Sequence, residues 1–195
     1  FEDAYEAFAE VMEYGEKAGA DFIHIETMSD TYEVKAAVLG AKEHTKLPVF
    51  VTVVFDERGK MLTGGTVEAV TALLEGLRVD AIGMNCGLGP EQMIGLVKEF
   101  RKYCSLPLIV KPNAGLPKQK NGQVYYDVEP DIFAERMEEI IDLGASAVGG
   151  CCGTTPEHIR RMITLCEKKT VLLPEEKTTT VVSSYSQAVA FSDVP

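Results

Sequence analysis

The alternation of short apolar runs with helix-forming segments is the feature that most limits how this chain can fold. Five apolar runs are expected to be strands, at residues 21–26, 48–54, 80–86, 107–111 and 146–150. A segment with helical spacing of its apolar residues follows each run, at 31–46, 66–77, 90–103, 130–143 and 155–168, and another precedes the first at 1–19. Strands that alternate with helices in this way predict an α/β fold with a parallel sheet.

The unusual residues of the chain follow the predicted strands. They are Glu26-Thr27, the glycine-rich loop 56–65, Asn85-Cys86, Pro112-Asn113 and Cys151-Cys152. In parallel α/β proteins, open or closed, ligands bind at the carboxyl ends of the strands. We therefore expect one site at this end of the sheet. The loop 112–129 also contains Asn121-Gly122, which predicts a small hairpin.

The adjacent Cys151 and Cys152 lie between glycines, where an apolar run ends and a helix begins. Neighbouring side chains of a straight strand point to opposite faces, so both thiols reach one target only if the backbone bends, which glycine permits. Cys86, 65 residues before Cys151, also ends a predicted strand and precedes a glycine. Three thiolates would leave a zinc ion one open coordination position, as in catalytic sites, and thiolate-rich coordination suits a thiol substrate.

Two other interpretations of these thiols remain open. The first is a structural zinc module, for which His158, in the first turn of the following helix, is the nearby candidate for a fourth ligand. The second is a redox protein with a disulfide between Cys151 and Cys152. Cys86 taken alone could be a buried strand residue. Cys104 and Cys166, near predicted helix ends, are expected to pack as small apolar side chains.

The positions of four further polar residues in the sequence suggest what their roles are. Glu26 ends an apolar strand, so its carboxylate either contacts a ligand or makes a structural hydrogen bond. Asn113 is either a turn former or a substrate contact. His24 shares a strand face with Glu26 and is expected to be a hydrogen-bonded interior residue. We expect His158 to face solvent.

Composition excludes several classes of function. The chain has 195 residues, of which 46% are hydrophobic and 25% charged, typical of a globular protein. Its net charge of -11 argues against nucleic acid or an anionic membrane surface as a partner. No apolar run approaches the roughly 20 residues that span a bilayer. No basic-then-apolar stretch opens the sequence, so we do not expect secretion. Five cysteines, an odd number, favour free thiols, a reducing compartment and a cytoplasmic location.

Four ordered motifs resemble those of the homocysteine S-methyltransferases. They are Gly-Gly-Cys-Cys-Gly-Thr at 149–154, Gly-Met-Asn-Cys at 83–86, Glu-Thr at 26–27 and Pro-Asn-Ala-Gly at 112–115. The resemblance implies a (β/α)8 barrel and a transferase that methylates homocysteine to methionine, a step of methionine biosynthesis. It further implies that Cys86, Cys151 and Cys152 bind zinc, and that Glu26 and Asn113 hold the amino acid part of homocysteine.

The connector after the barrel, which includes residues 181–184, resembles that of the cobalamin-dependent methionine synthases. This resemblance implies that methylcobalamin donates the methyl group, supplied from 5-methyltetrahydrofolate, and that cobalamin and folate bind on other domains of the same polypeptide. Betaine- or S-methylmethionine-type methyltransferases are the alternative. We expect residues 1–169 to form part of the barrel, strands 4 to 8, and 170–195 to form a linker toward a folate-binding domain. Because a barrel of eight strands takes typically ~250 residues, we expect this chain to be a fragment with weak or no activity in isolation.

Overall fold

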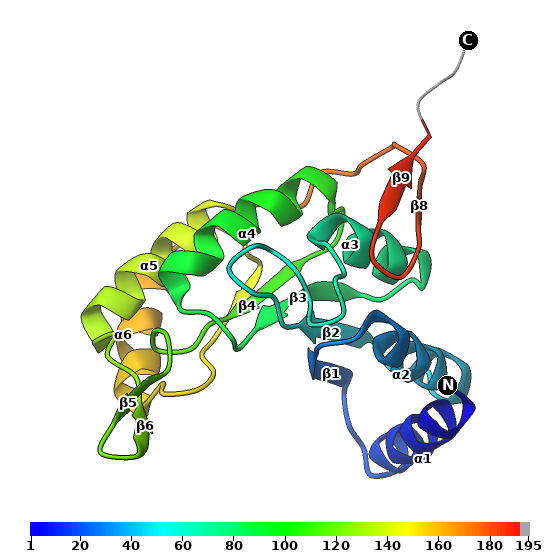
Figure 1. Cartoon of the computed structure of the whole chain (residues 1–195), viewed down its shortest axis with the longest axis horizontal. Helices are drawn as coiled ribbons and strands as arrows, with labels where there is room; N and C mark the ends of the chain where they lie inside the picture. Colours follow the sequence, from blue (N-terminus) through cyan, green and yellow to red (C-terminus); the bar gives the residue numbers. More distant parts are fainter. Residues whose placement is uncertain (192–195) are drawn as a thin grey trace.

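The computed structural model describes residues 1–191 and has a parallel sheet with helices packed along it (Figure 1). The helices are α1 (Glu2–Lys17), α2 (Thr31–His44), α3 (Val67–Gly76), α4 (Pro90–Tyr103), α5 (Pro130–Asp142) and α6 (Pro156–Cys166). The strands of the main sheet are β1 (Ile23–Met28), β2 (Val49–Val53), β3 (Ala81–Asn85), β4 (Leu108–Lys111) and β7 (Ala147–Val148). Two hairpins complete the described chain, β5 (Lys118–Lys120) with β6 (Gln123–Tyr125), and β8 (Val181–Ser183) with β9 (Ala188–Ala190).

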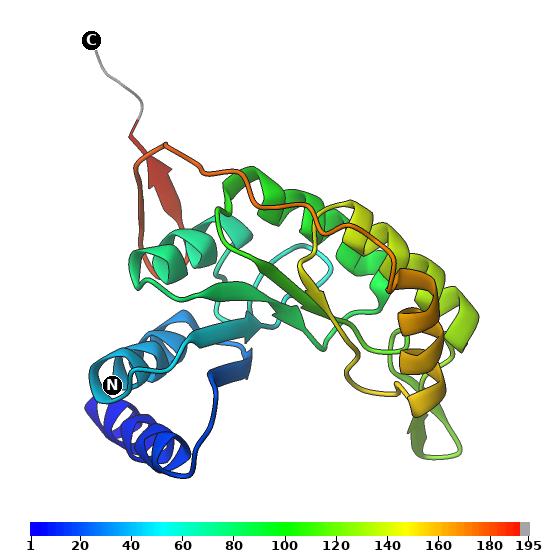
Figure 2. The same cartoon turned by 180° about the vertical axis from the view of Figure 1, so that it is seen from behind.

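The main sheet has the order β1-β2-β3-β4-β7, and every neighbouring pair is parallel. This confirms the predicted α/β class. Successive helices pack against one another from α1 to α6, so that the row of helices follows the curve of the sheet (Figure 2). Because all five strands run the same way, their carboxyl ends meet at one edge, where the predicted site residues lie.

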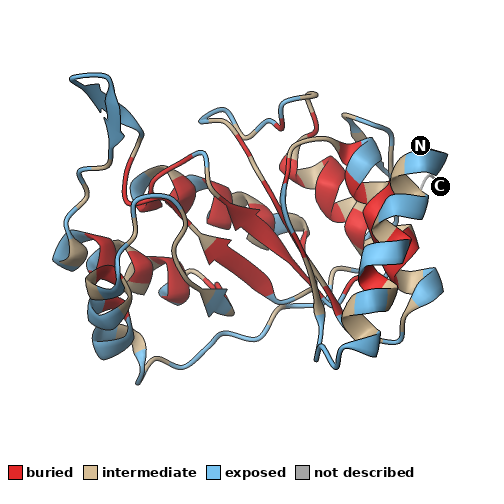
Figure 3. Cartoon of the chain, turned by 90° about the horizontal axis from the view of Figure 1, so that it is seen from below, coloured by how far each residue is buried: buried red, intermediate tan, exposed pale blue. Residues whose placement is uncertain are grey.

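The core lies between the sheet and the helices, and the central strands are buried (Figure 3). Its largest fully buried side chains include Phe100 of α4, Phe133 of α5 and Leu74 of α3. Local signals begin two of the helices where the sequence predicts. The Asp30 carboxylate accepts hydrogen bonds from the first turn of α2, and the Thr66 hydroxyl accepts one from the first turn of α3. None of the helices within residues 1–191 has both the length and the apolar character to cross a membrane.

The structure differs from the expected elements in two places. The last strand of the sheet is only two residues long, although Gly149 N still donates to Val110 O at 3.1 Å. The stretch after residue 170, expected to be a connector without regular structure, contains the β8–β9 hairpin, which packs against α3. Its turn, between Ser184 and Gln187, has no glycine or asparagine, so the usual sequence signal of a hairpin is missing.

Candidate metal centre

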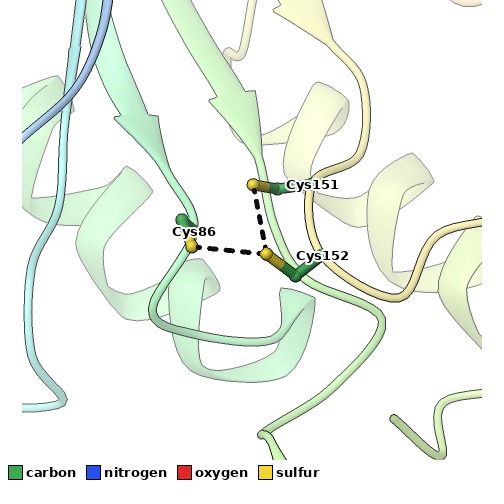
Figure 4. Close-up of side chains that lie close together, drawn as sticks. All are labelled: Cys86, Cys151 and Cys152. Carbon is green, nitrogen blue, oxygen red and sulfur yellow. Dashed lines mark hydrogen bonds between the residues drawn. The ribbon is translucent and has the colours of Figure 1, made fainter. Parts of the chain in front are cut away.

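Three thiols meet at the carboxyl edge of the sheet. Cys86 follows β3, and Cys151 and Cys152 follow β7; their sulfur atoms all lie within 4.8 Å of one another (Figure 4). The Cys86 and Cys152 sulfurs are 3.8 Å apart, and those of Cys151 and Cys152 are 4.0 Å apart. Four ligands at the zinc–sulfur distance of about 2.3 Å from a tetrahedral centre would be roughly 3.8 Å from one another. Two of the three sulfur pairs therefore have the spacing of neighbouring ligands in a tetrahedral zinc site, and the third pair lies within 4.8 Å.

The predicted bend between the two adjacent cysteines is present. Cys151 N donates to Pro112 O at 2.8 Å, and Cys152 N donates to the Asn113 side-chain oxygen at 3.0 Å. Gly153 then adopts a positive φ of 78°. On the other side, a Cβ at Gly150 would lie 2.5–2.6 Å from the Thr154 side chain, so only glycine fits. Glycines on both sides thus allow the two thiols to point to the same place.

Cys86 itself has a strained backbone. Its φ is +60°, unusual for a residue with a side chain, and Gly87 continues the turn at +70°. The turn is closed by two hydrogen bonds, from Cys86 N to Lys111 O at 3.1 Å and from Leu88 N to Cys86 O at 2.7 Å. Strain of this kind persists where surrounding contacts hold it, commonly at functional sites. Here the strained turn directs the Cys86 thiol, which follows β3, toward the two thiols that follow β7.

Asn85 contacts one of the thiols through its side chain, a role that the sequence motif did not reveal. Its side chain is fully buried. The amide oxygen accepts from Thr27 N at 3.1 Å, and the amide nitrogen donates to the Thr27 hydroxyl at 2.7 Å and to the Cys151 sulfur at 3.8 Å. Thr27 also has a positive φ, 63°, at the irregularity in the β1–β2 pairing. Hydrogen bonds from Asn85 therefore link the irregular part of β1, at Thr27, to the thiol cluster.

The environment of Cys151 disfavours its charged form. Burial raises the pKa of the Cys151 thiol to about 11, although the hydrogen bond from Asn85 acts in the opposite direction. Nearby Cys86 and Cys152 raise it further, because negative charges repel. The Cys151 thiol is therefore protonated at neutral pH unless a cation is close, and a coordinated metal ion is the cation that deprotonates thiols outright.

Asn113 and Glu26, the two predicted substrate contacts, lie in different settings. Asn113 is buried, and its side-chain oxygen orients the backbone of Cys152. Glu26 forms an ion pair with Lys111, which the sequence reasoning did not identify, and its side chain is 48% exposed. The Lys111 hydrogen bond holds the pKa of Glu26 below its usual value. Glu26 thus makes a structural ion pair and also keeps an exposed surface that a further ligand can contact.

His24 is hydrogen-bonded, as predicted, but it is half-buried and not an interior residue. Its ring nitrogen Nε2 lies 3.3 Å from the Thr52 hydroxyl and 3.4 Å from Lys111 Nζ. Burial, followed by the positive charge of Lys111, lowers the pKa of His24. His24, Lys111 and Glu26 thus form one polar group that joins β1 to β4.

The expectation that His158 faces solvent is wrong. Its side chain is buried, and the Nδ1 atom accepts from Thr155 N at 3.2 Å, which completes a capping box at the start of α6. Its Nε2 atom donates to Val128 O at 2.8 Å. Both ring nitrogens therefore have partners, and His158 offers no free atom as a fourth metal ligand. This removes the support for a structural zinc module built on His158.

The other cysteines lie apart from this centre. Cys104, at the end of α4, is fully buried, as expected for a packing residue, and Cys166 ends α6 half-buried. All five cysteines are free thiols in the structure, including Cys151 and Cys152.

Comparison with known proteins gives one consistent family. The family model for homocysteine S-methyltransferase matches residues 1–166. The methionine synthase of Mycobacterium leprae is 39% identical over 188 residues, which cover 91% of this chain and 16% of that protein. The methionine synthase of Mycobacterium tuberculosis is 41% identical over 150 residues, covering 74% and 13%. The chain thus spans only 13–16% of the length of these two curated relatives.

Solved structures agree with the family. The oxidized form of the homocysteine methyltransferase MmuM from Escherichia coli has a TM-score of 0.67 at 26% identity, covering 82% of this chain and 52% of that one. The metallated form of the same enzyme has a TM-score of 0.65 at 27% identity, covering 82% and 51%. The sheet order, the thiol-bearing strand ends and these matches lead to one conclusion: the chain belongs to the homocysteine S-methyltransferase family.

Proposed function

We propose that this chain binds a zinc ion through Cys86, Cys151 and Cys152 and uses it to activate homocysteine for methylation to methionine. The observation that carries the proposal is that three thiols converge within 4.8 Å of one another, with two of the sulfur pairs, at 3.8 and 4.0 Å, spaced like neighbouring ligands of a tetrahedral zinc ion. The metallated state named for the Escherichia coli relative supports a metal at this family's site. The fourth position would be left for the thiol of homocysteine.

A bound zinc ion would supply the acidity that holds the homocysteine thiol as a thiolate at neutral pH. The residues of the chain perform the remaining tasks. Asn85 and Asn113 hold Cys151 and Cys152 in place through hydrogen bonds. Glu26 has the charge and exposure to bind the ammonium group of the amino acid. The Asn113 side-chain oxygen already accepts a hydrogen bond from Cys152 N. Contact with the substrate would be a second role of Asn113.

The relatives support a proposal for the methyl donor. Two methionine synthases at 39% and 41% identity are nearer in sequence than the Escherichia coli homocysteine methyltransferase at 26–27%. We therefore infer that methylcobalamin, recharged from 5-methyltetrahydrofolate, supplies the methyl group from other domains of a longer polypeptide. A betaine- or S-methylmethionine-dependent reaction is the alternative.

Two further inferences belong to this proposal. The Mycobacterium leprae match is longer than the family-model match of 166 residues, which supports residues 170–195 as a segment that leads to a further domain of a methionine synthase. A cytoplasmic location suits five free thiols, because a reducing compartment keeps them available for metal.

The test is the zinc content of the purified protein. We expect about one zinc per chain in the wild type, and nearly none in Cys86→Ser, because a three-ligand site loses a ligand. Cys166→Ser is the matched control, since it makes the same atomic change in a thiol outside the cluster. Homocysteine should release a proton on binding to the zinc-loaded wild type, measured by titration calorimetry in buffers of different ionisation enthalpy. Full zinc content in Cys86→Ser, or homocysteine binding without proton release, would contradict the proposal.

A further inference from the structure

A salt bridge crosses the sheet between β1 and β4. Lys111 ends β4, Glu26 lies in β1, and their side chains form an ion pair. The strands β2 and β3 separate β1 from β4 in the sheet, so the two side chains reach each other across one of its faces. His24 of β1 belongs to the same group, because its Nε2 atom lies 3.4 Å from Lys111 Nζ and 3.3 Å from the Thr52 hydroxyl of β2.

Both members of this salt bridge belong to segments that hold the thiol cluster. Lys111 O accepts a hydrogen bond from Cys86 N at 3.1 Å. Glu26 directly precedes Thr27, which makes hydrogen bonds of 3.1 and 2.7 Å with Asn85, the residue before Cys86. We therefore expect the rest of a substrate whose thiol binds at the cluster to lie near the salt bridge.

The Lys111 ammonium group has little contact with solvent. Its side chain is only 18% exposed, and a Cβ placed on Gly149 would lie 3.3 Å from Lys111 Cγ, so the aliphatic stem packs against this glycine. Because an ammonium group can only donate, the His24 Nε2 atom is the acceptor in their contact and the ring is uncharged. Among residues 1–191, Glu26 provides the one carboxylate within ion-pair distance of Lys111.

An α-amino acid carries an ammonium group and a carboxylate on the same carbon atom. In the proposed function its ammonium group binds Glu26, and so takes the place of the Lys111 ammonium group. Lys111 would then be a largely buried cation with a neutral imidazole as its remaining contact, which costs free energy. The substrate carboxylate arrives together with the ammonium group and supplies the missing negative charge. Two positive and two negative groups then lie together without net charge.

We propose that Lys111 binds the carboxylate of homocysteine, and that it neutralises Glu26 until the ammonium group of the substrate takes its place. The inference rests on the proposed function and adds a second recognition residue to it. It also makes the site selective for an amino acid. A thiol without a carboxylate would leave Lys111 unpaired, and a thiol without an ammonium group could not release Lys111 from Glu26.

The test measures the affinity of the zinc-loaded full chain for two thiols by titration calorimetry. One is homocysteine, and the other is homocysteamine, which lacks the carboxylate. In Lys111→Met, homocysteine should bind about tenfold or more weakly, because a hydrogen-bonded pair of charges is lost. Homocysteamine should bind as tightly as to the wild type or more tightly, because Lys111 no longer competes with it for Glu26.

Lys118→Met is the matched control. It makes the same atomic change in a lysine that forms an ion pair with Asp127 on the exposed strand β5, and it should leave both affinities within about twofold of wild type. Wild-type affinity for homocysteine in Lys111→Met, or an equal loss for both thiols, would overturn the assignment. A lysine that only joins β1 to β4 would affect both thiols alike.

A second variant tests the same inference if Lys111→Met does not fold, as judged by circular dichroism. Glu26→Gln removes the carboxylate that neutralises Lys111. The thiol 4-mercaptobutanoate, which lacks the ammonium group, should therefore bind this variant about tenfold or more tightly than it binds the wild type. The absence of any gain would also overturn the assignment. If the zinc-loaded wild type does not bind homocysteine, the proposed function fails. If it binds homocysteine but the variants lack the expected pattern, only the role of Lys111 fails.

Discussion

Replacing Asn85 with alanine should weaken both the fold and the metal site. The side chain makes two hydrogen bonds to Thr27, of 3.1 and 2.7 Å, and a longer one of 3.8 Å to the Cys151 sulfur. Each of the two shorter bonds contributes about 1 kcal/mol net, and the small cavity left in a fully buried position adds up to about 1 kcal/mol. We therefore expect the free energy of unfolding to fall by about 2–3 kcal/mol. For a chain of this length, that lowers Tm by about 4–12 °C.

The assay is urea unfolding of the metal-free chain, followed by circular dichroism, with Thr71→Val as the matched control. The Thr71 hydroxyl is buried in α3 and has no hydrogen-bond partner in the described structure. Replacing it with a methyl group of similar shape should be neutral or slightly stabilising. Both variants remove a buried polar group, so a difference between them reports the hydrogen bonds of Asn85 and not burial alone.

The same variant should bind zinc about 10- to 100-fold more weakly, because the partner that orients Cys151 is gone. The reasoning would be refuted if Asn85→Ala lost less than about 0.5 kcal/mol, or no more than Thr71→Val. Loss of stability with unchanged zinc affinity would limit Asn85 to supporting the β1 bulge.

Three further predictions follow from single positions. In Gly83→Ala, the new Cβ would meet the backbone of Ile109 on the next strand, 2.6 Å from its carbonyl carbon and 2.8 Å from its nitrogen, so we expect a loss of more than about 4 kcal/mol or failure to fold, measured by urea unfolding. Lys111→Met should destabilise the chain at neutral pH; because Lys111 lowers the folded-state pKa of Glu26, the difference from wild type should shrink below about pH 4, as Glu26 protonates, and a pH-independent difference would contradict this. Burial raises the pKa of the Cys104 thiol to about 12, so iodoacetamide at pH 8 should leave it unmodified in the native chain and label it after denaturation, as read by peptide mass spectrometry.

Much of the scaffold is predictable because its signals are local. Apolar runs and helical spacing locate the five strands and six helices of the α/β unit, and the boundaries differ from the structure by few residues. Asp30 and Thr66 cap α2 and α3 because a short polar side chain satisfies the first backbone N–H groups wherever a helix starts. Asn121-Gly122 predicts the β5–β6 hairpin for a similar reason, since both residues adopt the positive φ that the turn needs.

The residues that were missed act through partners distant in sequence. His158 is buried and hydrogen-bonded to Val128 O, 30 residues away, whereas its neighbours in the sequence suggested a solvent-facing position. Lys111 is unremarkable at the end of β4 until the sheet brings Glu26, 85 residues earlier, beside it. The β8–β9 hairpin is stabilised by packing on α3 and by a hydrogen bond from the Thr31 hydroxyl to Tyr185 O at 2.9 Å, not by its turn residues.

The sequence alone determined the family, the parallel α/β class and which three cysteines are the metal-ligand candidates. It could do so because motifs, periodicity and glycine positions are local properties of the chain. Only the tertiary structure decided how the thiols are supported. Their convergence within 4.8 Å of one another depends on strand register and on the contacts from Asn85 and Asn113. Hydrogen bonds between residues far apart in the chain form only when the sheet has brought the strand ends together. For this reason the metal-ligand candidates could be read from the sequence, whereas the groups that orient them could not.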